Sequence, residues 1–401
     1  MITYWNTTKI PESELRSRRS RVMKEMEKHD AHGALFFSGS SLQYLTGQGF
    51  IETERPIVLI LKENGEAAMF VPFLEREHIE EVTPGIDRVE SYVEYPGPEH
   101  PMKLLAKFLE ELGLSDKTVI ADSDGYGSHF GYTGPTISSQ CMGMNLIRVP
   151  QLIPMLKRIK SAFDVTGIRE VTRWANLAHA LLYEYTRPGL KELEVVHRVM
   201  AEATRSMLLT LGPDFQPGAD IVATADYRGQ IGKETYYPHA LCTNATFQEG
   251  DILGTRARAG MFGYCSELER CMFIGEPTAE MRTYYDHVIA MQDVAFNVIR
   301  PGIPCSEVDK AVMNYYKENG LMDYWRHHVG HALGLGKHEA PFFDPFEDTI
   351  IEPGMVFSVE PGLYIKGLGG FRLSDSVLVT ESGIEMLTYY PRELERNIIP
   401  V

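Results

Sequence analysis

Through residues 1–155, apolar positions alternate between helical spacing and short strand-like runs. Helical spacing predicts helices over Glu12–His29 and Pro101–Leu114. Apolar runs bounded by turn residues predict strands at Gly33–Phe37, Pro56–Leu61, Glu66–Val71 and Thr118–Asp122. A turn is expected at Ser38–Ser41, after the first strand, and a turn at Lys62–Gly65 joins the second and third strands in a hairpin. Helices interleaved with short strands predict a compact α/β domain with a mixed sheet.

The pattern changes after the segment Leu152–Lys160, which we interpret as a domain boundary. Helical spacing predicts four helices, at Asp164–Arg187, Leu190–Leu211, Glu280–Ile299 and Ser306–Asn319. The stretches Gly250–Gly275 and Pro353–Val379 are rich in glycine and short apolar runs, which favours antiparallel strand pairs. We therefore expect an N-terminal α/β domain over residues 1–155 and an α+β domain over residues 156–401.

Composition narrows the classes of partner. The chain has 401 residues, of which 44% are hydrophobic and 23% charged, and its formal charge of −16 disfavours nucleic acid or an anionic membrane as a partner. No run of 18 apolar residues and no apolar leader occurs, and the five cysteines lack CxxC spacing, which indicates reduced thiols. We expect a cytoplasmic protein that binds a small molecule.

Ionisable residues interrupt the apolar, strand-like segments of the second half. They are His239, Glu267, Glu269, His331, His338 and Glu360. Charged groups in such positions are costly unless they are paired, so they mark a candidate site. Taken singly, each is better explained as a structural ion pair or a core histidine, but together they favour a functional cluster.

Glu267 and Glu269 are two positions apart, so on a strand both side chains point to the same face. Such a pair of like charges must be offset by a cation, a shared proton or a metal ion. With His331 and Glu360 in reach, the residue types favour a metal centre as the first interpretation. Arg256, eleven residues before Glu267, is a second candidate for the compensating cation.

Four ordered motifs resemble those of the creatinase/prolidase ("pita-bread") family of Xaa-Pro peptidases. They are Gly250-Asp251 with Gly263-Tyr264-Cys265-Ser266-Glu267-Leu268-Glu269-Arg270, then Gly330-His331 with His338, then Ser358-Val359-Glu360-Pro361, and Gly369-Gly370-Phe371-Arg372-Leu373-Ser374-Asp375. The resemblance covers essentially the whole chain. It implies a creatinase-like N-terminal domain followed by a pita-bread catalytic domain, together classed as α+β.

The resemblance also implies which residues occupy the family's metal-ligand positions: Arg256, Glu267, His331, Glu360 and Ser374. Metal-dependent members carry two Asp, one His and two Glu there. Guanidinium in place of a carboxylate puts positive charge where ions would sit. We therefore expect no metal cofactor, with Arg256 paired to Glu267 or Glu360. The alternative is one divalent ion held by Glu267, His331 and Glu360.

Within the family, the pattern resembles metal-free creatinase. This likeness implies that His239 is the general base and acid, that Glu269 and Glu360 hold the substrate, and that Arg55, His331 and His338 contact it, with Arg55 binding a carboxylate across a homodimer. We expect a metal-independent hydrolase that cleaves a C–N bond of a small guanidine, amidine or cyclic amidine bearing a carboxylate. The alternatives are a metal-dependent Xaa-Pro dipeptidase or aminopeptidase, and a non-catalytic binding module.

Overall fold

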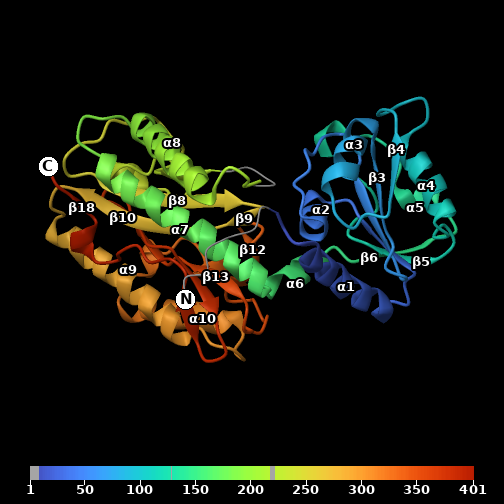
Figure 1. Cartoon of the computed structure of the whole chain (residues 1–401). Coiled ribbons are helices and arrows are strands. Elements are labelled where there is room, and N and C mark those ends of the chain that lie inside the picture. Colours follow the sequence, from blue (N-terminus) through green and yellow to red (C-terminus); the bar gives the residue numbers. More distant parts are fainter. Residues whose placement is uncertain (1–8, 128, 217–221) are drawn as a thin grey trace. The chain divides into compact units, whose positions relative to one another are not determined.

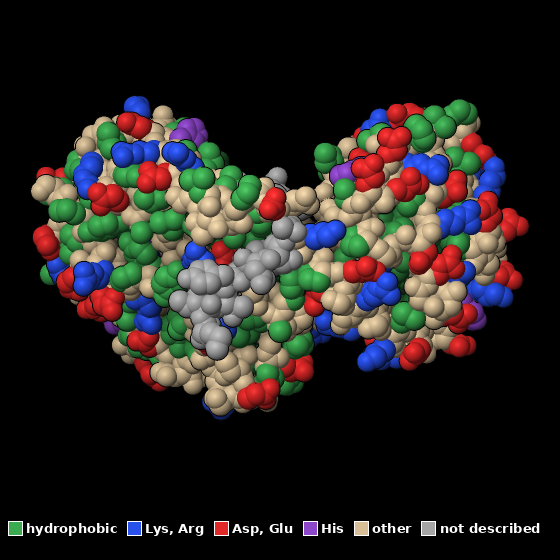
Figure 2. Space-filling model, viewed as in Figure 1, with side chains coloured by type: hydrophobic (Ala, Val, Ile, Leu, Met, Phe, Trp, Pro, Cys, Tyr) green, Lys and Arg blue, Asp and Glu red, His purple; other side chains and the backbone are tan. Residues whose placement is uncertain are grey.

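The computed structural model of the chain describes residues 9–127, 129–216 and 222–401 (Figure 1). The chain divides into two compact units that meet in sequence between Lys157 and Arg158. On the face in Figure 2, acidic and basic side chains are interspersed, without one dominant basic patch. Among the described residues, no helix combines the length and the apolar composition needed to cross a bilayer.

The first unit is built on a six-stranded mixed sheet with the order β4-β3-β2-β1-β5-β6. The strands are β1 (Gly33–Phe36), β2 (Val58–Lys62), β3 (Ala67–Pro72), β4 (Arg88–Tyr92), β5 (Thr118–Ala121) and β6 (Asn145–Arg148). Strands β1, β2 and β3 pair antiparallel, and the other neighbours pair parallel. The expected α/β domain with a mixed sheet and a β2–β3 hairpin is confirmed.

The helices of this unit are α1 (Glu12–Lys28), α2 (Gly39–Thr46), α3 (Phe73–Val82), α4 (Pro101–Glu111), α5 (Ile137–Gln140), the 3₁₀ turn η1 (His129–Gly131) and α6 (Leu152–Arg158). The sequence predicted a turn at Ser38–Ser41, which is wrong, because α2 begins there. Leu42, Tyr44 and Leu45 are buried, and Gly47 ends the helix with a left-handed φ of 77°. Burial of one helical face outweighs the serine-rich start.

The second unit contains two larger sheets and a hairpin. The first sheet has the order β18-β10-β8-β7, with β9 also paired to β8, and consists of β7 (Ala223–Asp226), β8 (Ile252–Met261), β9 (Tyr264–Cys265), β10 (Leu268–Ile274) and β18 (Ile398–Ile399). The second has the order β12-β11-β13-β16-β17, and consists of β11 (Gly330–Ala332), β12 (Glu339–Phe343), β13 (Val356–Val359), β16 (Asp375–Val379) and β17 (Ile384–Met386). The hairpin joins β14 (Gly362–Ile365) to β15 (Gly369–Arg372).

Helices cover these sheets: α7 (Ala162–Tyr185), α8 (Glu192–Leu211), α9 (Ala279–Val298) and α10 (Cys305–Glu318), with 3₁₀ turns η2 (Gly232–Tyr236), η3 (Met322–Tyr324) and η4 (Leu394–Arg396). Helix α7 packs on β8 and α8, and α9 packs on α10 (Figure 1). Ser161 and Asp164 form a reciprocal capping box that fixes the start of α7. The α+β organisation expected for this unit is confirmed.

Strand β8 explains why charged side chains gather on one face of this unit. Thr255, Ala257 and Ala259 are buried, whereas Arg256 and Arg258 are only half-buried. Because side chains alternate across a strand, both arginines point to the same, more open face. Arg256 is also the cross-strand partner of Glu269 on β10 and of Asp226 on β7, so this face carries both signs of charge.

Candidate functional site

Charged and imidazole side chains surround a cavity of about 360 Å³ in the second unit. Its walls come from the loops after β7 and η2, from β10 and β15, and from the segments next to β11, β12 and β13; the lining residues are Arg228, Pro238, His239, Glu267, Glu269, Arg326, His327, His328, His338, Glu360 and Arg372. A larger cavity of about 990 Å³ lies elsewhere, between α9 and the segment after β17. The smaller cavity holds the predicted cluster.

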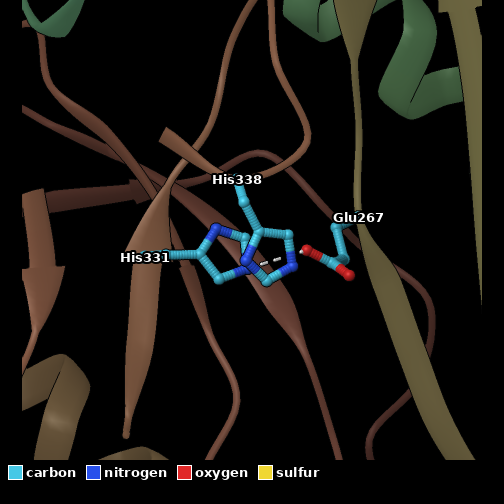
Figure 3. Close-up of side chains that lie close together, drawn as sticks. All are labelled: Glu267, His331 and His338. Atoms are coloured by element: carbon cyan, nitrogen blue, oxygen red, sulfur yellow. Dashed lines mark ion pairs between the residues drawn. The ribbon is translucent and has the colours of Figure 1, made fainter. Parts of the chain in front are cut away.

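The centre of the cluster is His331 on β11. Its Nε2 lies 3.2 Å from Oε2 of Glu267 and 3.4 Å from Oε1 of Glu360. The imidazole of His338 stacks on that of His331 with ring centroids 3.8 Å apart. Figure 3 shows the two rings lying over each other, with the Glu267 carboxylate pointing at them from the chain just before β10. The structure therefore brings together residues separated by as many as 93 positions in sequence, Glu267 to Glu360.

The facing atoms are close, but they do not satisfy one another. Within the described chain, Oε2 of Glu267 and Nε2 of His331 are buried and lack a hydrogen-bond partner. Nδ1 of His331 lies 3.0 Å from the carbonyl oxygen of Ala332, which can only accept, so Nδ1 donates. In the neutral ring this leaves the Nε2 lone pair directed at the carboxylates, the arrangement typical of a histidine that binds a metal ion.

The charges of the cluster shift one another's protonation. Burial works to lower the pKa of His331, but Glu267 and Glu360 outweigh it and raise that pKa to about 10. Burial raises the pKa of Glu360, whereas His331 holds the pKa of Glu267 below its usual value although burial opposes this. The space between the two carboxylates therefore favours a positive charge.

Glu269 belongs to a separate ion pair at one wall. Arg372 donates to both of its carboxylate oxygens, including a hydrogen bond of 2.9 Å from Nη2 to Oε1, and Arg228 lies 3.6 Å from Oε1. Arg372 also donates to the hydroxyl of Tyr364 at 3.1 Å, and that hydroxyl lies 2.8 Å from Nε2 of His327. Two guanidinium groups thus already neutralise the Glu269 carboxylate.

His239 lies in a turn just after η2, not on a strand-like segment as the sequence suggested. Its side chain lines the cavity. Burial, Arg228 and Arg372 lower the pKa of His239 below its ordinary value. The imidazole is therefore neutral at pH 7 and able to accept a proton there.

Arg256 and Ser374 do not occupy the centre of the cluster. Arg256 pairs with Asp226, with 3.0 Å between Nη2 and Oδ2, so the expectation that it pairs with Glu267 or Glu360 is wrong. Asp226 is its direct cross-strand neighbour and outcompetes Glu269, which Arg372 already holds. Ser374 is buried and shares a hydrogen bond of 2.6 Å with Ser358.

Arg55 lies in the first unit. Its guanidinium pairs with Glu54 at 2.6 Å and with Glu94 at 2.7 Å. Glu94 raises the pKa of Arg55 through this contact. The role of Arg55 in binding a substrate carboxylate stays a prediction.

Sequence reasoning missed Arg228, Arg372 and His327 as members of the site. Arg372 stands in a recognised motif, and its charge within the apolar run of β15 was a signal of the same kind that marked Glu360. Arg228 follows β7 and has a left-handed φ of 50°. No local sequence pattern predicts this backbone conformation. His327 follows no apolar run, so nothing in the sequence separates it from a surface histidine.

Two family models match the chain. The model described as Metallopeptidase family M24 matches residues 166–381, and that of the Creatinase/Prolidase N-terminal domain matches residues 18–131.

Individual relatives cover nearly the whole chain. The uncharacterized peptidase YqhT of Bacillus subtilis is 26% identical over 365 residues, which is 90% of this chain and 95% of that protein. An Xaa-Pro dipeptidase from Bacillus anthracis is 25% identical, with a TM-score of 0.76, and the match covers 96% of this chain and all of that one. A prolidase from Thermococcus sibiricus is also 25% identical, with a TM-score of 0.79, over 96% and 99% of the two chains.

These findings correct two expectations from the sequence. The metal-independent, creatinase-like hydrolase is wrong, because the matched family is one of metallopeptidases and the similar solved structures are a dipeptidase and a prolidase. The absence of a metal cofactor is wrong for the same reason. Arg256 and Ser374 alter two of the family's ligand positions, but Glu267, His331 and Glu360 still converge.

The remaining side chains fit a divalent ion. Possible ligand atoms of Glu267, His331 and His338 lie within 4.8 Å of one another, as do those of Glu267, Glu269 and Glu360. One imidazole and two carboxylates form a donor set suited to a divalent transition metal. A second ion at Glu269 would have to compete with Arg372, and Arg256 and Ser374 supply no carboxylate, so the described side chains fit a single ion best.

Proposed function

Since the chain belongs to metallopeptidase family M24 and is a hydrolase of that family, we propose that it cleaves Xaa-Pro peptides with one divalent ion held by Glu267, His331 and Glu360. The observation that carries this proposal is the convergence of two buried atoms that lack hydrogen-bond partners, Oε2 of Glu267 and Nε2 of His331. A buried polar atom without a partner is costly, and a cation between the two atoms and Glu360 removes that cost.

When bound, such an ion supplies Lewis-acid polarisation of a carbonyl and a nucleophile from water at neutral pH. The protein supplies the rest of the chemistry. Glu267 and Glu360 neutralise the ion's charge, and the hydrogen bond from Nδ1 of His331 to Ala332 holds the ring in a fixed orientation. His338, stacked on His331, leaves the cluster with a second imidazole that faces the cavity.

His239 is the proton carrier in this proposal. It lines the cavity, and the lowered pKa keeps its imidazole neutral near pH 7. A neutral imidazole can take a proton during attack and return it to the leaving nitrogen of the proline ring. This second step matters because the tertiary amide nitrogen of an Xaa-Pro bond is a poor leaving group until it is protonated.

Arg228 is placed to stabilise charge that develops on the substrate carbonyl. Its Nε is buried and lacks a hydrogen-bond partner in the described chain, and its guanidinium lines the cavity. A fixed donor of this kind contributes most when negative charge appears only in the transition state.

The test is the hydrolysis of a small peptide panel by purified protein supplied with Mn²⁺. We expect cleavage of Ala-Pro and Gly-Pro, little cleavage of Ala-Ala, and loss of activity after treatment with a chelator. The variant His239→Gln should lower kcat by roughly a hundredfold or more while its folding remains intact. Cleavage that is indifferent to proline, or that survives complete metal removal, contradicts the proposal.

A homodimer, a cytoplasmic location and binding of the substrate carboxylate by Arg55 belong to the same proposal. The resemblance to this family supports the dimer, and Arg55 pairs only with two neighbouring acids in the described part of its own unit. Sedimentation of the purified chain tests the dimer.

A further inference from the structure

A second cavity, of about 350 Å³, lies beside the candidate active site and is lined by two cations, Arg258 and Lys337. We call it the basic cavity. Tyr264, Cys265 and Ser266 form another part of its wall. Within the described part of the chain no carboxylate lines the basic cavity, so no lining residue neutralises the positive charges of Arg258 and Lys337.

Local structure holds the two cations in place. Arg258 points from the open face of β8, which β7 and β10 flank on both sides. Lys337 lies in the loop between β11 and β12, and the amide of Cys265 fastens that loop to β9 by donating to the carbonyl of Gly334 at 2.8 Å. The backbone of both cations is therefore held by the sheet or by a hydrogen bond to it.

Neither cation has a strong partner of its own. Asp226 is the nearest acid, but it lies 3.0 Å from Arg256 and 3.9 Å from Arg258. Lys337 makes no ion pair with any residue that the structure describes. Arg256 and Arg258 thus share one carboxylate and Lys337 pairs with none in the described chain, and this excess of positive charge favours an anionic ligand.

The basic cavity adjoins the active site through the chain itself. Ser266 lines the basic cavity, and the next residue, Glu267, lines the active site. Likewise, Lys337 lines the basic cavity and His338 lines the active site. The two cavities therefore lie against the same two short segments of chain, and Arg258 is close enough to Glu267 for their charges to interact.

We infer that Arg258 and Lys337 bind a carboxylate of the substrate, one residue or less from the bond that is cleaved. This inference rests on the proposed function, which makes the ligand a peptide, whose anionic groups are carboxylates. The carboxylate is either the acidic side chain of the residue before proline or the free C-terminus of a dipeptide.

The first test measures binding without turnover. Calorimetry with glutarate compares the wild type with Arg258→Gln and Lys337→Gln, and with two matched controls, Arg300→Gln and Lys366→Gln, whose side chains are exposed elsewhere in this unit. We expect each cavity variant to weaken glutarate binding by roughly tenfold or more, the range for a hydrogen bond to a charged group, and the controls to leave it unchanged. Equal affinity in all five proteins, or no binding to the wild type, overturns the inference.

The second test identifies the source of the carboxylate from kcat/KM. If the side chain is bound, the wild type prefers Glu-Pro to Gln-Pro, and Lys337→Gln removes the preference. If the C-terminus is bound, the wild type prefers Ala-Pro to its amide, and the same variant removes that preference. Ratios that the variant leaves unchanged overturn the inference and leave the proposed peptidase standing. A wild type that cleaves no Xaa-Pro peptide overturns the proposed function, and glutarate binding still decides the inference.

Discussion

Glu267 and Glu269 are two positions apart and face the same cavity, but their partners differ. Glu267 lies 3.2 Å from an imidazole nitrogen that makes no hydrogen bond in the described chain, whereas Arg372 holds Glu269 with two hydrogen bonds. A carboxylate already neutralised by guanidinium binds a metal ion poorly, because the ion has to displace a charge-assisted pair. The two residues should therefore respond differently to the same substitution.

We predict that Glu267→Gln loses the bound ion and that Glu269→Gln keeps it. Loss of an outer-sphere partner alone costs roughly ten- to a hundredfold in metal affinity, so loss of the direct ligand Glu267 should cost more than a hundredfold. Glu269→Gln leaves Arg372 buried without its partner, so it should destabilise the fold instead, by about 3 kcal/mol or more. Elemental analysis and thermal unfolding of both variants separate the effects. Retention of the ion by folded Glu267→Gln would count against the assignment.

The residue scale also explains why sequence reasoning found the cluster but misjudged its chemistry. Charges inside apolar runs marked Glu267, His331 and Glu360, and all three meet at one point. The sequence could not show that Arg256 turns to Asp226, because that choice depends on strand register across β7, β8 and β10. Without the register, Arg256 looked like a substitute for an ion.

At the scale of elements, helix α10 carries a buried acid that opposes folding at high pH. Asp309 is 2% exposed, and its Oδ1 lacks a hydrogen-bond partner in the described chain. Burial and the nearby charge of Asp344 raise the pKa of Asp309 to about 6, although Lys317 works in the other direction. Because the folded pKa exceeds the unfolded one, folding favours the protonated form, and stability falls as the pH rises from about 4 through 6.

We therefore predict that Asp309→Asn raises the melting temperature at pH 8 and changes it little at pH 4. The gain should reach about 2 kcal/mol, after allowance for solvent screening of the charge. Thermal unfolding monitored by circular dichroism across this pH range measures it, with Asp286→Asn on α9 as a control in the same unit. A stabilisation that is equal at both pH values would show that ionisation of Asp309 is not the cause.

Element prediction worked best where periodicity was long. Helices α7, α8, α9 and α10 lie where helical spacing predicted them, and each is 14 residues or longer. It failed at α2, which has eight residues and a start that resembles a turn, and it missed α3, whose exposed Phe73 and Leu74 blur the helical pattern. Short elements depend on what they pack against, and a sequence does not state that.

At the scale of the whole molecule, the ordered motifs were enough to predict both units and the family. The motifs could not decide whether two altered positions abolish metal binding. That depends on the folded arrangement, in which His331 on β11 meets Glu267, just before β10, and Glu360, just after β13. The net charge of −16 is compatible with the basic cavity, because the local charge of a site does not depend on the net charge of the whole chain.

A metal titration tests the proposed single-ion site most directly. Protein stripped of metal is titrated with Mn²⁺ while bound ion and hydrolysis of Ala-Pro are measured on the same samples. We predict no turnover in the stripped protein, a linear rise with added ion, and full activity at one ion per chain. Full turnover by protein proven free of metal would contradict the account.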